Sequence, residues 1–162
     1  RNEIYEDIYY NFWNEDKQAF TQARGSDVID ASALLIPIVR LLSPYEKRWQ
    51  STLKAIEEEL SADTLIYRYR TTAGAKDGLE GEEGTFSLCS FWYIENLAKA
   101  GQVTKARLYF EKMLGYANHL GLFSEMIALN GEQVGNFPQA FTHLALISAA
   151  LQLDYMLDNG VQ

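Results

Sequence analysis

Cysteine and histidine are scarce in this sequence of 162 residues, which contains one Cys, Cys89, and two His, His119 and His143. A single Cys excludes a disulfide within the chain and leans slightly toward a cytoplasmic location. The Cys and His residues lack the spacing of zinc ligands, and the glycines do not precede a helix in the phosphate-binding pattern. No motif supports a Ser-His-Asp triad. The sequence therefore predicts no metal site and no cofactor.

Positive charge is also in short supply, because 14 Lys and Arg stand against 22 Asp and Glu and no basic stripe is present. An acidic surface repels phosphate groups, so we expect neither nucleic acid nor a membrane as a partner. No signal-peptide pattern opens the sequence, and no uninterrupted apolar run approaches the length of a membrane span. The chain is instead rich in hydrophobic residues, at 48%, of which many are aromatic. This composition predicts a packed globular chain.

Helical periodicity divides the chain into six segments of two kinds. Three have one apolar face and one polar face: residues 3–13, 43–60 and 103–119. Three are apolar nearly all round and are expected to be buried on both sides: residues 30–42, 85–99 and 138–157. The two kinds alternate, which predicts an all-α fold of three helical hairpins with outer and inner helices. Such hairpins form either an open solenoid or a closed α/α toroid.

Local signals mark several ends of these helices. Asp30 is suited to cap the second segment, and Pro37 is expected to kink its middle. Ser43 and Glu46 have the spacing of a capping box, with Pro44 at the first helical position. The third helix is therefore predicted to start directly after Ser43.

The links that lead from an outer helix to the next inner one are long. They span roughly residues 14–29, 61–84 and 120–136, and all three are expected at the same end of the bundle. They carry carboxylates, Arg and Tyr, which are the groups that bind neutral sugars and hydrolyse their linkages. This composition is weak support by itself, because a Glu in a loop is most commonly solvated surface.

Four blocks of the sequence resemble one known family. They are "GSDVIDASALLIP", "LIYRYR", "GEEGTFSLCSFWYIENLAKAG" and "SEMIALNGEQVGNFPQAFTHLALI". In order and spacing they are similar to the C-terminal stretch of bacterial glycoside hydrolase family 15, the glucoamylase and trehalase-like enzymes. The resemblance implies that residues 1–162 are one partial domain, the last three hairpins of an (α/α)6 toroid, and that the substrate is an α-glucoside or oligosaccharide.

The resemblance also implies roles for individual residues. Members of this family invert the anomeric centre with a general acid and a general base, and the base lies in a Ser-Glu motif that corresponds to Ser124-Glu125. Glu125 is therefore expected to be the general base. The expected substrate-binding residues are Arg68, Tyr69, Glu83, Phe86, Asp30 and Phe141.

Each of these residues also has a simpler interpretation. Arg68 could pair with Glu80 or Glu82, and Asp30 could serve only as a helix cap. Phe86 and Phe141 could belong to the core, which we would favour without the resemblance. Cys89 and His143, on nearly apolar segments, are expected to be buried structural residues.

Two features depart from the family pattern. Met126 and "ALNG" follow the expected base, where bacterial members commonly have a second acidic residue and an Asp-Pro turn. The Trp-Glu segment that carries the general acid is absent from these residues. We therefore expect the chain alone to be inactive, and its partner to be the missing N-terminal part of the enzyme or a second copy of the chain. The alternative is a non-catalytic helical scaffold that binds sugar or protein.

Overall fold

The computed structural model describes residues 1–70 and 84–160, which form helices joined by links with short strands. The chain divides into two compact units. Unit 1 comprises residues 1–61 together with 68–70, and unit 2 comprises residues 62–67 together with 84–160. Each unit is described separately below.

Unit 1 is built around helix α3 (Lys47–Leu60). The other elements of this unit are α1 (Asn2–Asn11), β1 (Trp13–Asn14), β2 (Ala19–Phe20), the 3₁₀ helix η1 (Ala31–Leu34) and α2 (Leu35–Ile38). The sequence predicts an inner stripe of Tyr45, Trp49, Leu53, Ile56 and Leu60 for this helix. The last four are buried, as predicted, but Tyr45 lies before α3 begins and is 62% exposed, so the prediction was wrong there. The antiparallel pair β1–β2 is joined to α3 because the Thr52 hydroxyl accepts a hydrogen bond from the Phe20 amide at 2.9 Å.

The segment predicted as one helix over residues 30–42 is shorter and changes its geometry. Asp30 is the N-cap, as predicted, and its side chain accepts a hydrogen bond from the Ser32 amide at 2.7 Å. The chain then forms η1 and α2 and leaves helical geometry after Ile38. Pro37 has no amide hydrogen to donate to the preceding turn, and Arg40 adopts a left-handed φ of 60°. Because Val39 is also 66% exposed, the expectation of burial on both sides was wrong.

The predicted capping box before α3 was also wrong by three residues. Glu46, not Ser43, is the N-cap, and its carboxylate accepts a hydrogen bond from the Trp49 amide at 2.9 Å. The Ser43 hydroxyl instead accepts from the Tyr45 amide in the preceding turn. A carboxylate at the N-cap satisfies an amide of the first turn as well as a hydroxyl does, so both sites were compatible with the sequence.

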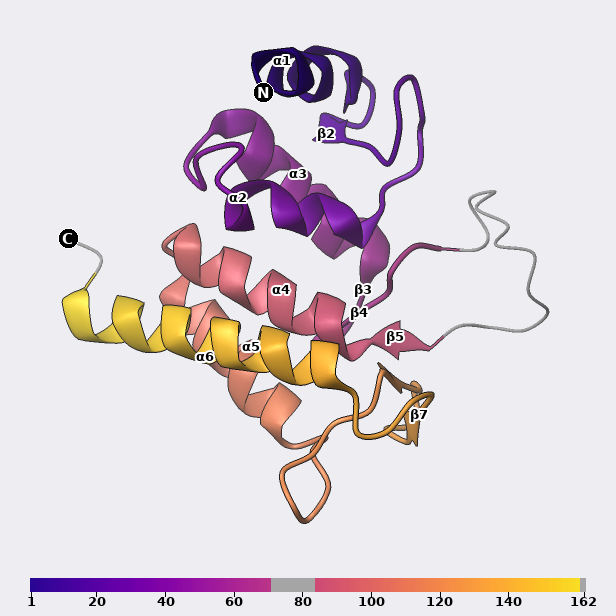
Figure 1. The fold of residues 1–162 in the computed structure, drawn as a ribbon, viewed down its shortest axis with the longest axis vertical. Coiled ribbons are helices and arrows are strands. Elements are labelled where there is room, and N and C mark those ends of the chain that lie inside the picture. The colour runs from indigo at the N-terminus through magenta and orange to yellow at the C-terminus, as the bar shows by residue number, and fades with distance from the viewer. Residues whose placement is uncertain (71–83, 161–162) are drawn as a thin grey trace. The chain divides into compact units, whose positions relative to one another are not determined.

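Unit 2 consists mainly of three helices: α4 (Ser87–Lys99), α5 (Val103–Leu114) and α6 (Ala140–Asn159). α4 and α6 run side by side, and α5 contacts both of them (Figure 1). Short strands lie in the links: β3 (Ser61–Ala62) pairs with β4 (Leu65–Ile66), and β5 (Thr85–Phe86), β6 (Met126–Ile127) and β7 (Gln133–Val134) form an antiparallel sheet in that order. The sequence predicts an extended conformation from Leu65 to Tyr69, and β4 confirms it for Leu65 and Ile66.

The predicted helix over residues 103–119 ends five residues early. After Leu114 the chain turns tightly, because the amides of Tyr116 and Ala117 donate to carbonyls three residues back. The Asn118 side chain then accepts hydrogen bonds from the Leu120 and Leu122 amides and directs the chain away from the helix axis.

α4 is buried on nearly all sides, as predicted, but α6 is not. Only Thr142, Ala145, Ala149 and Leu153 of α6 are buried. Its apolar side chains on the opposite side are largely exposed, including Phe141, Leu144, Ile147, Leu151 and Tyr155. By length and composition alone α6 is also apolar enough to cross a membrane, which the sequence had not led us to expect. The described residues therefore bury less of α6 than its apolar pattern predicted.

A buried polar network joins α4 to α6. The Glu95 carboxylate on α4 is 3% exposed and accepts a hydrogen bond from the Ser148 hydroxyl of α6 at 2.7 Å. Lys99 forms an ion pair with Glu95 at 3.3 Å and donates to the Gln152 side chain of α6 at 3.0 Å. These bonds compensate the cost of burying the carboxylate and fix the register of the two helices.

Removal of the cation from this network is expected to destabilise unit 2. The Lys99→Met variant would leave the buried Glu95 carboxylate without its ion pair, at a cost of about 2 kcal/mol in the free energy of unfolding. This lies below the cost for a fully buried pair, because Ser148 still donates. The matched control is Lys54→Met, since Lys54 forms an exposed pair with Glu58 at the same four-residue spacing. Urea unfolding should show a loss of no more than about 0.5 kcal/mol for the control. Equal losses in both variants would contradict the burial argument.

Candidate active site

Glu125 lies in unit 2, where the link before α6 meets the end of the link before α4. It precedes β6, the central strand of the three-stranded sheet. The Glu125 carbonyl accepts a hydrogen bond from the amide of Ser87, the first residue of α4, at 3.0 Å. The Glu125 amide donates to the Asn136 carbonyl at 2.9 Å on the other side. The backbone of Glu125 is therefore held from both neighbouring segments.

The carboxylate of Glu125 is fixed as well as its backbone. Its Oε2 atom accepts two hydrogen bonds from Asn136, one from the backbone amide at 3.1 Å and one from Nδ2 at 2.9 Å. Glu125 is half-exposed, so solvent reaches the carboxylate. An oriented and ionisable group with access to water has the geometry that a general base requires.

The two residues before Glu125 are tied to the first turns of α6. The Phe123 amide donates to His143 Nε2 at 3.3 Å, and the Thr142 hydroxyl donates to the Ser124 carbonyl at 3.2 Å. His143 Nδ1 lies 2.7 Å from the Gln139 carbonyl, so Nδ1 carries the proton and Nε2 is the acceptor. His143 is thus half-buried and structural, not fully buried as we expected, while Cys89 is buried as predicted.

The two aromatic residues predicted near the substrate lie close to Glu125 in the chain fold of unit 2. Phe86 on β5 pairs with Met126, the residue after Glu125, and is half-buried. Phe141 lies in the first turn of α6 beside Thr142 and is 67% exposed. The alternative that Phe141 belongs to the core of this chain is therefore wrong. Unit 2 brings Glu125, Phe86 and Phe141 to the segments around one sheet.

The remaining described candidates lie together in unit 1. The Arg68 carbonyl accepts a hydrogen bond from the Ala31 amide at 2.8 Å, which places Arg68 next to Asp30. The Arg68 guanidinium donates to the Tyr69 hydroxyl at 2.8 Å and lies 4.6 Å from the centre of its ring. Both side chains are half-buried. A guanidinium, a phenol and a carboxylate grouped in this way can donate to and accept from sugar hydroxyls.

Three acidic residues of the predicted site region, Glu80, Glu82 and Glu83, lie outside the described residues. Within the described part of the chain, no group of three or more His, Cys, Asp or Glu could hold a metal ion.

The model of the family "Glycosyl hydrolases family 15" matches residues 1–151. This match covers most of the chain. The chain belongs to glycosyl hydrolases family 15. The resemblance stated from the four sequence blocks is thereby confirmed.

Several relatives of this family 15 chain are trehalases. One from Mycobacterium tuberculosis is 44% identical over 140 residues, which are 86% of this chain and 20% of the relative. Another from Thermoplasma acidophilum is 39% identical over 156 residues, or 95% of this chain and 26% of the relative. The chain thus spans about a fifth to a quarter of the length of these relatives.

Solved glycosidase structures share the fold. A wild-type glycosidase superposes with a TM-score of 0.77 at 19% identity, over 94% of this chain and 43% of that one. A glycosidase variant in complex with glucose superposes with a TM-score of 0.78 at the same identity and coverage. At this identity the likeness establishes the helical fold of the family 15 chain.

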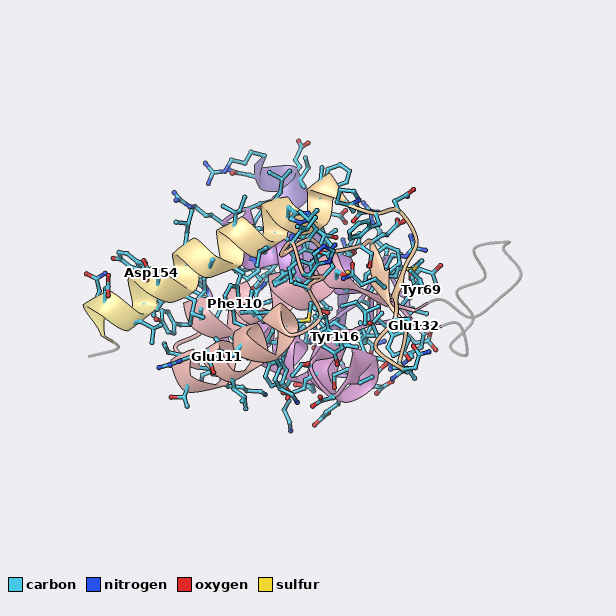
Figure 2. All side chains as sticks on the ribbon, turned by 90° about the horizontal axis from the view of Figure 1, so that it is seen from below. Tyr69, Phe110, Glu111, Tyr116, Glu132 and Asp154 are labelled. Carbon is cyan, nitrogen blue, oxygen red and sulfur yellow. The ribbon has the colours of Figure 1, made fainter. Side chains whose placement is uncertain are left out.

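The Gly-Glu-Gln turn of this family 15 chain has a supporting role in the fold. Gln133 donates through Nε2 to the carbonyls of Tyr116 and Leu122, at 2.8 and 3.3 Å, and so joins the turn to the end of α5. Glu132 is exposed, and its carboxylate accepts a hydrogen bond from the Asn130 side chain at 3.0 Å. Figure 2 shows Glu132 and Asp154 at opposite ends of unit 2, with Glu132 at the end that carries the links.

Sequence reasoning missed the most direct contact of the site, the one between Asn136 and Glu125. The sequence assigned no role to Asn136, which directly precedes Phe137-Pro138. Its signal was the Gly135-Asn136 pair at the end of a long link, because glycine followed by a short amide residue is typical of a built turn. A contact across eleven residues has no periodic signal in a single sequence.

Proposed function

We propose that this chain is part of an inverting glycosidase that hydrolyses α-glucosidic bonds, and that Glu125 is its general base. One observation carries the proposal: in a family 15 chain, the half-exposed Glu125 carboxylate is held on one oxygen by Asn136. Carboxylates in this role must be fixed in direction yet reachable by water.

The chemistry follows from a pair of carboxyl groups. Glu125 takes a proton from a water molecule while the water oxygen forms a bond to the anomeric carbon. The bond from that carbon to the leaving oxygen breaks on the opposite face, and a general acid protonates the leaving oxygen. In inverting enzymes the two carboxyl groups lie about 6.5–9.5 Å apart to make room for the water. The general acid belongs to a part of the enzyme outside these 162 residues.

Trehalose is the substrate that the comparisons support best. The two relatives described above are trehalases at 44% and 39% identity, well above the identity of the solved glycosidases. In this proposal Phe86 and Phe141 supply aromatic faces near Glu125, and Asp30, Arg68 and Tyr69 bind hydroxyl groups. Glu83 keeps the substrate-binding role that the resemblance implies for it.

The exposed side of α6 supports the partial-domain interpretation. In this proposal the chain forms three helical hairpins of an α/α toroid, and its partner is the missing part of the enzyme or a second copy of the chain. The apolar side chains of α6 that remain exposed here would be covered by that partner. The small share of each relative that the chain spans agrees with the first of these partners.

The products of trehalose hydrolysis test the proposal. The complete enzyme is expected to release equal amounts of α- and β-glucose, because only the attacked ring inverts. Proton NMR of the anomeric hydrogens distinguishes the two products before mutarotation. The 162-residue chain alone is expected to release no glucose from trehalose, maltose or isomaltose.

Other outcomes separate the parts of the proposal. Formation of α-glucose only would contradict inversion, and glucose release by the chain alone would show that a general acid is supplied within it. Binding of trehalose by the complete protein without turnover would favour the non-catalytic scaffold. Light scattering decides between the partners, since a monomer in solution contradicts the second copy.

A further inference from the structure

The Gly135-Asn136 segment lies beside the carboxylate of Glu125, and Asn136 donates two hydrogen bonds to it. We infer that Asn136 is a positioning residue for Glu125, and that Gly135 is required next to it because no side chain fits there. This inference rests on the proposed role of Glu125 as general base. Asn136 contacts neither the water nor the sugar in this scheme and acts through the carboxylate.

Both donors from Asn136 reach the same carboxylate oxygen. The backbone amide and Nδ2 lie 3.1 and 2.9 Å from Oε2, so two hydrogen bonds to a charged acceptor fix the rotation of the carboxylate. Within residues 1–70 and 84–160, no hydrogen-bond donor contacts Oε1. In this scheme Oε2 is the anchored oxygen, and Oε1 is the one that takes the proton from water.

A backbone hydrogen bond also joins Glu125 to Asn136. The Glu125 amide donates to the Asn136 carbonyl at 2.9 Å, and the Asn136 amide donates to the Glu125 carboxylate at 3.1 Å. A rotation of the Glu125 side chain away from Asn136 would break the two bonds on Oε2 without any replacement from described residues. The Asn136 amide is thus placed by the same backbone pairing that places its acceptor.

The backbone of Gly135 lies close to the side chains of Glu125 and Met126. Its φ is +78°, a left-handed conformation that residues with a Cβ rarely adopt. A Cβ at this position would lie 2.9 Å from Glu125 Oε2 and 3.1 Å from both Glu125 Cβ and Met126 Cε. Any side chain here would push the carboxylate out of its place beside Asn136.

The test compares variants of Asn136 in the complete enzyme with trehalose as substrate. Asn136→Ala removes the Nδ2 donor, and we expect kcat to fall about 10- to 100-fold, because a small displacement of a reacting group has effects of this size. KM should change by less than about threefold, since the residue does not touch the sugar. Asn136→Ser restores a donor, and its kcat should recover by several-fold over the Ala variant.

One control variant and one further test variant complete the comparison. Asn130→Ala removes an exposed Asn of the same link that bonds to Glu132, and its kcat should stay within about twofold of the unchanged enzyme. Gly135→Ala should lower kcat at least as much as Asn136→Ala. The positioning role would be overturned if Asn136→Ala changed KM and left kcat unchanged. It would also be overturned if the Ser variant were as slow as the Ala variant.

The Glu125→Gln variant distinguishes failure of this inference from failure of the proposed function. Full turnover by Glu125→Gln would show that Glu125 is not the general base, and the proposed function would then be wrong. Loss of turnover in Glu125→Gln together with full turnover in Asn136→Ala would overturn only the positioning role.

Discussion

Replacement of Glu125 by Gln is expected to lower kcat of the complete enzyme on trehalose by about 10²–10⁴-fold, the usual worth of general acid–base catalysis. The amide of Gln cannot take a proton from water, but it has nearly the shape of the carboxylate. The two donors of Asn136 that reach Oε2 can still bond to the amide oxygen. The loss should therefore appear in kcat and only weakly in KM, as measured by steady-state glucose release.

The matched control for this substitution is Glu132→Gln. Glu132 lies in the same link and is exposed, and its carboxylate accepts a hydrogen bond from the Asn130 side chain, so its loss of charge should change kcat by no more than about twofold. Glucose binding measured by calorimetry should persist in Glu125→Gln, because the fold of the site is unchanged. Equal kcat values for the two variants would exclude Glu125 as the general base.

The helices could be predicted where burial and periodicity agree. α4 is apolar on nearly all sides and is buried on nearly all sides, and the stripe of α3 was correct from Trp49 to Leu60. Segment 30–42 could not be read in the same way, because Pro37 removes a backbone donor and Arg40 takes a left-handed conformation. These are local effects that a hydrophobic pattern does not record.

α6 shows a different limit of sequence reasoning. Its composition predicted burial on nearly all sides, and a single sequence cannot tell which chain would provide that burial. The described residues cover only the side that faces α4 and α5, where Ala145 and Ala149 allow close packing. The other side remains exposed with Leu144, Leu151 and Tyr155.

The residues of the candidate site could be predicted from the sequence, but the contacts between them could not. Glu125 and the aromatic residues around it were found from a resemblance in sequence, which records residue types in order. The contacts that orient Glu125 depend on the pairing of strands only two residues long, and such strands have too few residues for an alternating pattern. The contacts of Asn136 and Gly135 with Glu125 therefore follow from the structure, where the end of the link lies beside the start of β6.

The Phe91→Ala substitution is expected to cost about 3–5 kcal/mol in the free energy of unfolding of unit 2. Phe91 on α4 is 0% exposed and packs edge-on against Phe110 of α5 and Phe123, with ring centres 6.2 and 5.4 Å apart. Removal of the ring would leave a cavity among three segments that cannot close without moving a helix. Urea unfolding followed by circular dichroism measures the loss.

The control is Leu108→Ala on α5, since Leu108 is 55% exposed and should cost no more than about 0.5 kcal/mol. The consequences of Phe91→Ala should also reach the site, because Phe123 lies two residues before Glu125 and its amide is bonded to His143. Amide hydrogen exchange at Phe123 and Glu125 should therefore accelerate in Phe91→Ala and not in Leu108→Ala. Unchanged exchange at both amides would mean that the sheet and α6 hold Glu125 without the aromatic cluster, and that the stability of unit 2 and the geometry of the base are independent.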